Sequence, residues 1–138
     1  MSNVHTPSEN IKKLILFMVA IAAAVTNSVS VDCLGFETGF AWFSADPSGA
    51  GTTSDCKLQE SADDQNWMDV EDASFEQVTT AGGDKLYTMN INLSQRERYL
   101  RLVHTGAGAN AAGVAAGGID LMNARYNPVA QSETAVSV

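Results

Sequence analysis

The stretch that decides the fold runs from Lys57 to Val70 and reads Lys-Leu-Gln-Glu-Ser-Ala-Asp-Asp-Gln-Asn-Trp-Met-Asp-Val. A strand is predicted over 56–61 and a second over 67–70, because both segments place apolar residues between polar ones. Between them, 62–66 is predicted to be a tight turn, since Asp and Asn side chains cap the backbone of such turns. We therefore expect a β-hairpin that opens its second strand on a buried Trp67.

Further strands are expected on both sides of this hairpin, separated by loop signals such as Asp46-Pro-Ser-Gly-Ala-Gly51. The segment 86–93 alternates apolar and polar side chains with a period of two, which is the strand pattern. Strands of this length, with turns about every 8–12 residues, are typical of a sandwich or jelly roll. The strands expected outside the hairpin are 14–25, 29–32, 36–44, 75–78, 86–91, 98–103 and 114–123.

The predicted architecture is all-β: a single antiparallel β-sandwich or jelly-roll-like domain with an extended N-terminal arm. At 138 residues the chain has the length of one domain with a sizeable core. We place the arm at 1–11, the sandwich at 12–129 and a C-terminal tail at 130–138. The predicted core consists of Phe36, Phe40, Trp42, Leu58, Trp67, Val70, Tyr99, Leu100, Leu102 and Val103.

The run from Leu14 to Val25 is apolar at every position. As a strand it would be buried on both faces, so its second face would have to meet a partner subunit or a neighbour's arm. A buried helix is an alternative, because Leu, Met and Ala favour helices. A second alternative is a secretory signal behind Lys12 and Lys13, with cleavage near Ala24; the run is too short to span a membrane.

The segment 106–118 contains almost only Gly and Ala. A dinucleotide fingerprint needs a strand before it and a helix after it, and a phosphate loop needs a lysine. We interpret the segment instead as a long flexible loop between two strands.

Charge excludes nucleic acid as a partner. The chain carries 16 acidic against 8 basic residues, a formal net charge of −8, whereas nucleic-acid binding needs clustered Lys and Arg. Eight of the acidic residues fall between Asp55 and Glu76, which predicts a solvated outer face. The turn at Asp63 has oxygen ligands of the kind calcium prefers, but it lacks the EF-hand spacing, so turn chemistry is the preferred interpretation.

The residues that usually carry catalysis are scarce. The chain has two histidines, His5 in the arm and His104 near a strand end, and two cysteines, Cys33 and Cys56. They form no recognised catalytic or zinc-binding spacing, so we expect no enzyme, no cofactor and no metal site. The cysteines are expected to be two buried thiols that act as small hydrophobic residues.

Three motifs carry a resemblance to a known group of proteins. They are Cys33-Leu-Gly-Phe-Glu37, Arg98-Tyr-Leu-Arg-Leu-Val103 and Asn123-Ala-Arg-Tyr-Asn-Pro-Val129. Together with the hairpin, they resemble small β-sandwich virion proteins encoded in the head and structural modules of tailed bacteriophages and prophages. The resemblance covers residues 14 to 129.

The resemblance implies a non-enzymatic head decoration or cement protein that binds and stabilises the assembled capsid. Its implied partners are the major capsid protein and further copies of itself, as a trimer; no nucleic acid and no membrane are expected. The protein would be made in the host cytoplasm and located in the phage head. Arginine is enriched at protein interfaces, and the candidate interface residues are Lys12, Lys13, Phe17, Met18, Arg98, Arg101, Arg125 and Tyr126.

Other functions remain open at this point. The Ser61-Ala-Asp-Asp-Gln-Asn-Trp67 hairpin is similar to one in discoidin-like binding domains, which suggests a carbohydrate- or host-surface-binding module. Such a module would carry aromatic residues on exposed loops, whereas the aromatic residues here fall in or beside predicted strands. A tail-associated virion protein and a secreted protein cleaved near Ala24 are the remaining alternatives.

Overall fold

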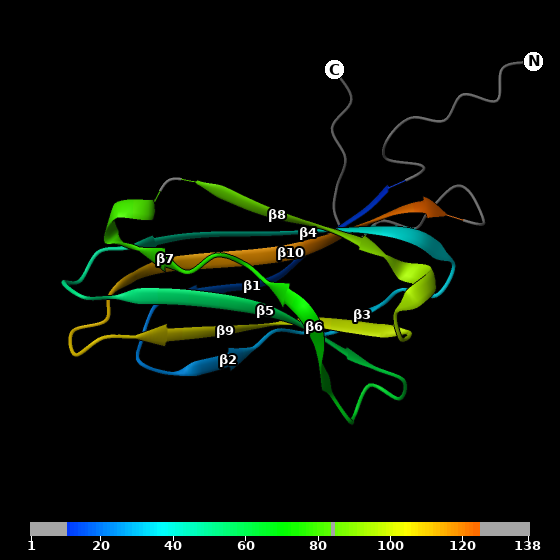
Figure 1. Cartoon of the computed structure of the whole chain (residues 1–138), viewed down its shortest axis with the longest axis horizontal. Helices are drawn as coiled ribbons and strands as arrows, with labels where there is room; N and C mark the ends of the chain where they lie inside the picture. Colours follow the sequence, from blue (N-terminus) through cyan, green and yellow to red (C-terminus); the bar gives the residue numbers. More distant parts are fainter. Residues whose placement is uncertain (1–10, 84, 125–138) are drawn as a thin grey trace, which may run out of the picture.

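Two antiparallel β-sheets pack face to face in the structure, a computed structural model that describes residues 11–83 and 85–124 (Figure 1). The first sheet has the strand order β1 (Ile11–Ala20), β10 (Gly113–Ala124), β4 (Phe36–Pro47), β8 (Leu86–Asn92). The second has the order β2 (Val25–Asn27), β9 (Tyr99–Ala107), β5 (Thr53–Ser61), β6 (Met68–Ser74), with β3 (Val31–Asp32) paired to β9 and β7 (Val78–Thr79) paired to β5. Two short 3-10 turns, η1 (Thr80–Gly82) and η2 (Leu93–Gln95), flank β8. The all-β sandwich expected from the sequence is confirmed.

The hairpin that opened the sequence argument is β5–β6. Gln59 pairs with Asp69 and Glu60 with Met68 across it. The Asp63 carboxylate closes the turn by accepting hydrogen bonds from the backbone N–H groups of Gln65 (3.0 Å) and Asn66 (2.8 Å). These bonds, led by that from Asn66, lower the pKa of Asp63.

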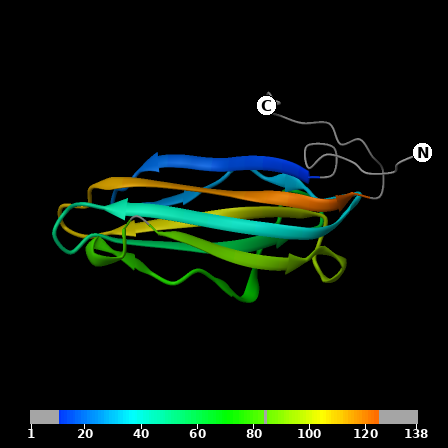
Figure 2. The ribbon, with the colours of Figure 1, turned by 90° about the horizontal axis from the view of Figure 1, so that it is seen from above.

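Strand β1 decides between the strand and the helix interpretation of the apolar run. It pairs antiparallel with β10 from Ile11–Met122 to Ala20–Val114, so the helix interpretation is wrong. The prediction of one strand as far as Val25 is also wrong, because β1 ends at Ala20 and Val25 begins β2 in the other sheet (Figure 2). Cleavage near Ala24 would remove a whole edge strand from the first sheet.

Phe43 lies at the centre of the core, fully buried between the two sheets. Its ring approaches those of Phe75 (5.6 Å), His104 (6.1 Å), Phe17 and Tyr87 (both 6.3 Å). The predicted core members Leu58, Leu100, Leu102 and Val103 are buried, and Phe36 and Val70 pack partly against the core.

Four predicted core residues are not in the core: Phe40, Trp42, Trp67 and Tyr99 are only partly buried. In β4 the buried positions are the odd-numbered ones, including Ala41, Phe43 and Ala45. Successive side chains of a strand point to opposite faces, so Phe40 and Trp42 point outward.

The interpretation of 106–118 as a flexible loop is wrong, because most of it belongs to β9 and β10. At two of its glycines, Gly117 and Gly118, rings from neighbouring strands lie against the backbone. A Cβ on Gly117 would come within 3.0 Å of the Phe17 ring carbon Cζ, and one on Gly118 within 2.8 Å of the Trp42 ring. Glycine in a strand interior often marks such a close approach.

Both cysteines are buried free thiols, as expected. Burial raises the pKa of Cys33 and of Cys56 to about 12. Over residues 11–83 and 85–124, no helix is long and apolar enough to cross a membrane.

Candidate interaction surface

The outer face of the first sheet is mostly apolar, and we call it the apolar face. The pairing register aligns its side chains in rows across the four strands; one row contains Met18, Ala116, Ser44 and Leu86. The next row contains Ile15, Gly118, Trp42 and Thr88. Charged side chains occur in only two of the rows: Lys13 pairs with Asp120, and Asp46 lies beside Val114 at the opposite end.

Four of the eight large hydrophobic residues that the described part of the chain exposes lie on the apolar face: Ile15, Met18, Leu86 and Val114. Met18 is 73% exposed and Val114 63%. Met18 and Val114 line a hollow of about 380 Å³ together with Ala116, Ser44 and Asp46. Contiguous exposed apolar surface of this kind marks an interaction site in soluble proteins.

The outer face of the second sheet, which we call the polar face, is cross-linked by side-chain hydrogen bonds. Asp69 accepts from Lys57 Nζ at 2.9 Å and from Gln59 Nε2 at 2.7 Å. Arg101 Nε donates to Gln59 Oε1 at 2.9 Å, and its guanidinium lies over the Trp67 ring, 4.4 Å from the centroid. Trp67 is therefore a half-buried partner of Arg101, and its predicted role as a core anchor is wrong.

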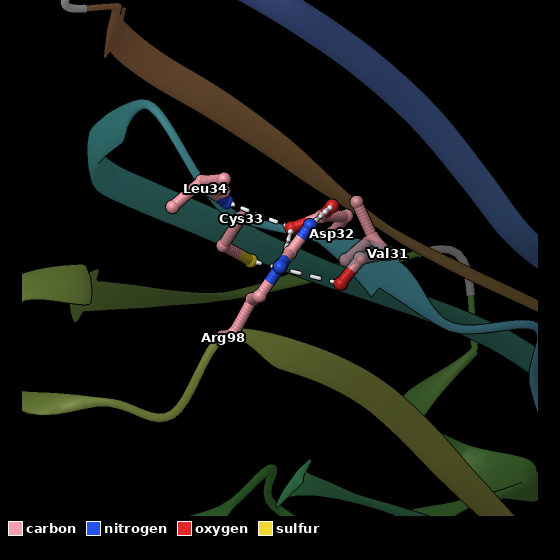
Figure 3. Close-up of polar contacts among 5 residues, drawn as sticks. All are labelled: Val31, Asp32, Cys33, Leu34 and Arg98. Carbon is pink, nitrogen blue, oxygen red and sulfur yellow. Dashed lines mark hydrogen bonds and ion pairs between the residues drawn. The ribbon is translucent and has the colours of Figure 1, made fainter. Parts of the chain in front are cut away.

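An ion pair at one end of the sandwich ties β3 to the start of β9. Arg98 Nη2 donates to Asp32 Oδ2 at 2.7 Å and Arg98 Nε to Asp32 Oδ1 at 3.0 Å (Figure 3). The same Oδ1 accepts from the backbone N–H of Leu34 at 3.0 Å. The Arg98 hydrogen bonds are the main reason why the pKa of Asp32 is lowered.

The candidate interface residues do not gather on one surface. Met18 and Lys13 lie on the apolar face, whereas Arg101 is on the polar face and Arg98 is engaged with Asp32. The positive charge of Lys12 is near enough to Asp32 to lower its pKa. Arg125, Tyr126 and the expected arm Met1–Asn10 lie outside the described residues.

Phe17 is not at a surface. It is 6% exposed, and its ring lies 5.5 Å from His104 and 6.3 Å from Phe43. A bulge between Ile15 and Phe17 shifts the register of β1 and puts both Leu16 and Phe17 inside. Phe17 is therefore a core residue, and the prediction that it is an interface residue is wrong.

Sequence reasoning missed a serine–histidine pair. His104 lies within β9, away from the strand end where it was expected, and its Nε2 is hydrogen-bonded to Ser54 Oγ. Both side chains are buried, and the His104 ring packs between Phe17 and Phe43. Burial also lowers the pKa of His104. A substrate cannot reach either atom, so the pair is part of the core packing.

In the described part of the chain, no three His, Cys, Asp or Glu side chains are grouped so that they could hold a metal ion. Asp63, the candidate calcium ligand, has both carboxylate oxygens engaged by its own turn. Oδ2 accepts from Asn66 Nδ2 at 2.7 Å, and Oδ1 also accepts from Ser61 Oγ at 2.9 Å. Turn chemistry accounts for the acidic residue at this position.

No protein-family model matches the chain, and the curated proteins contain no match to it. Among solved structures, the chain is similar to the PBSX exported protein XepA, with a TM-score of 0.59 and 19% identity over 100% of this chain. The chain spans 46% of the length of that protein. A second similarity, to the disulfide-linked pili of Bacillus endospore appendages, has a TM-score of 0.46 and 12% identity over 88% of this chain and 96% of that one. The likeness to XepA shows a shared fold.

Proposed function

We propose that the protein is a non-enzymatic structural component of a tailed-phage particle, and specifically a decoration or cement protein of the head. The observation that carries the proposal is the apolar face. A protein that acts alone in water gains nothing by exposing Ile15, Met18, Leu86 and Val114 together, since each Å² of apolar surface left wet forgoes about 25 cal/mol. The motifs that resemble phage virion proteins direct the proposal to the head, and the fold shared with the PBSX exported protein is compatible with it.

The proposed partners are the major capsid protein and further copies of this chain. A cement protein needs a rigid body and surfaces that dock on neighbours, and it needs no reaction centre. The sandwich supplies the rigid body. The acidic residues between Asp55 and Glu76, on the second sheet and its hairpin, keep the opposite side solvated.

Fractionated particles test the proposal. Heads and tails are separated from particles of a phage that encodes the chain, and each fraction is analysed by quantitative mass spectrometry. We expect the chain in the head fraction, and we expect heads assembled without it to lose DNA at a lower temperature. Detection in the tail fraction only would mean that the protein is a tail component. Absence from both fractions would contradict a virion role.

A carbohydrate- or host-surface-binding role is the second candidate, and one observation favours it. Trp67 lies on the polar face beside Gln59 and Arg101, an aromatic ring among planar polar groups. Binding of the purified chain to glycans of the host surface, lost in Trp67→Ala, would support this role. Absence of binding would leave the Trp67–Arg101 contact as a stabilising pair only.

A further inference from the structure

We propose that the apolar face is a self-association surface, on which a second copy of this chain docks with its own apolar face across a two-fold axis. This inference deepens the proposed function, on which it rests, by naming the occupant of the face. Two-fold contacts are the commonest in soluble homo-oligomers, and they require a surface that is complementary to itself. The shape, the charge and the area of the apolar face all support such a contact.

Exposed side chains and a hollow lie side by side, which is the arrangement that a self-complementary surface needs. Ile15 and Met18 are exposed on the edge strand β1, and Met18 lines the hollow together with Ala116 of β10. A two-fold axis near the rim places Met18 of each copy in the hollow of the other. The small side chains of Ala115 and Ala116 on β10 leave the hollow open.

Charge favours a second copy on this face over the outer face of the second sheet. A chain with a net charge of −8 repels its own copies. The paired rows of the apolar face hold one lysine, Lys13, and two aspartates, Asp120 and Asp46, which is a net charge of about −1 at neutral pH. Eight of the sixteen acidic residues lie on the second sheet and its hairpin, so contact there would bring like charges together.

The area is sufficient for a dimer. Four strands spaced about 4.8 Å apart cover roughly 19 Å, and the ten residues of β1 extend about 33 Å, so each copy contributes roughly 600 Å². Two copies that overlap over the whole face would bury at most roughly 1,200 Å², the lower limit of stable specific interfaces. We therefore expect a weak dimer that dissociates on dilution.

Pairing through the strand edge is the other route to a dimer, and β1 opposes it. Its register is broken by the bulge between Ile15 and Phe17, and Lys12 and Lys13 stand at its start. Bulges and lysines are the devices that keep edge strands from pairing with other chains. On the apolar face, Lys13 lies in a row with Asp120, and the rows of Met18 and Ile15 contain no charged side chain.

Sedimentation velocity of the full chain, over about 1 to 100 µM, tests the proposal with matched variants. Met18→Asp should weaken the dimer at least about a hundredfold, because each copy would bury an unpaired carboxylate. Met68→Asp is the control: Met68 is 65% exposed, close to the 73% of Met18, but lies on the hairpin of the second sheet. Val114→Asp and Val25→Asp form a second pair, 63% and 64% exposed, with Val25 on β2. Thermal melts establish that each variant is folded.

The expected result is a wild-type mass approaching twice 14.6 kDa, retained in the two controls and lost in Met18→Asp and Val114→Asp. A wild-type chain that remains a monomer at about 100 µM, a trimer, or equal effects of Met18→Asp and Met68→Asp would overturn the proposal. The proposed function in the phage head is tested by different outcomes. A monomer found in heads would overturn the dimer alone, and a dimer absent from particles would overturn the function alone.

Discussion

The apolar face and the polar face are the two outer surfaces of one sandwich, and they are built from strands of the same kind. On the polar face, neighbouring strands are joined side chain to side chain, as Asp69 joins Lys57 and Gln59. On the apolar face, the corresponding rows contain methionine, isoleucine, alanine and glycine, and an exposed methionine borders a hollow. The packing of the buried core does not depend on which kind of side chain the outer surface carries. The difference between them therefore reports what each surface meets.

The largest expected effect separates the inside of β4 from its outside. Phe43→Ala should lower the free energy of unfolding by about 3–5 kcal/mol, because Phe43 is fully buried among four other rings. Trp42→Ala, one residue away and on the apolar face, should cost at most about 2 kcal/mol at concentrations where the chain is a monomer. Urea unfolding measures both. Equal costs would contradict the placement of Phe43 inside and of Trp42 outside the sandwich, and a larger cost for Trp42→Ala would mean that β4 has the opposite orientation.

A smaller effect is expected on the polar face. Trp67→Ala should cost about 1–2 kcal/mol, since it removes a half-buried ring and its contact with the Arg101 guanidinium. Trp67→Ala should leave the self-association of the chain unchanged, whereas Trp42→Ala should change it, because Trp42 lies on the apolar face. Parallel urea unfolding and sedimentation measurements check both statements. A dimer weakened by Trp67→Ala would break the distinction between the faces.

The two faces share one buried layer, and His104 makes that layer sensitive to pH. Its folded-state pKa is lowered from 6.5 by burial, so the unfolded chain takes up a proton first as the pH falls. The stability contributed by neutral His104 is therefore complete above about pH 6.5 and is lost as the pH falls through the lowered folded-state value. The melting temperature should drop between about pH 7 and 5, and this drop should be shallower in His104→Gln. An equal drop in both proteins would assign the pH dependence to other groups.

The smallest effect is expected at the end of the sandwich. The side chains of Asp32 and Arg98 are 43% and 46% exposed. Exposed ion pairs contribute little and are screened by salt. Asp32→Asn should shift the melting temperature by at most about 2 °C, and less at high salt, as measured by circular dichroism. A larger shift would mean that β3 holds the second sheet together more firmly than its exposure indicates.

The sequence predicted the sandwich and most of its strands because the signals were local. The Asp63 turn and the alternation of 86–93 need only neighbouring residues, and both are observed. The sequence did not predict which side chains of β4 point inward, because the aromatic residues Phe40, Trp42 and Phe43 occur at both even and odd positions. The inner position Gly39 is small because Leu93 and Ile91 lie against it, at 3.3 and 3.4 Å from where a Cβ would stand. No local pattern contains that contact.

The candidate surface was only half visible in the sequence. The apolar run indicated that one face of β1 needs a cover, but the bulge that puts both Leu16 and Phe17 inside has no sequence signature here. The Gly/Ala segment resembled a loop because its packing partners, Phe17 and Trp42, come from strands far away in the chain. Ser54 and His104 are likewise 50 residues apart, and the β5–β9 pairing brings them together.

The most direct test of the account compares two methionines in one sample. In a single copy of the chain, Met18 is 73% exposed and Met68 65%, so a surface left uncovered would let dilute peroxide oxidise them at similar rates. Peptide mass spectrometry of the native protein, at a concentration where it is associated, measures both rates. We predict that Met68 is oxidised at least about tenfold faster than Met18, because Met18 is covered by the second copy. Oxidation of Met18 as fast as Met68 would contradict the account.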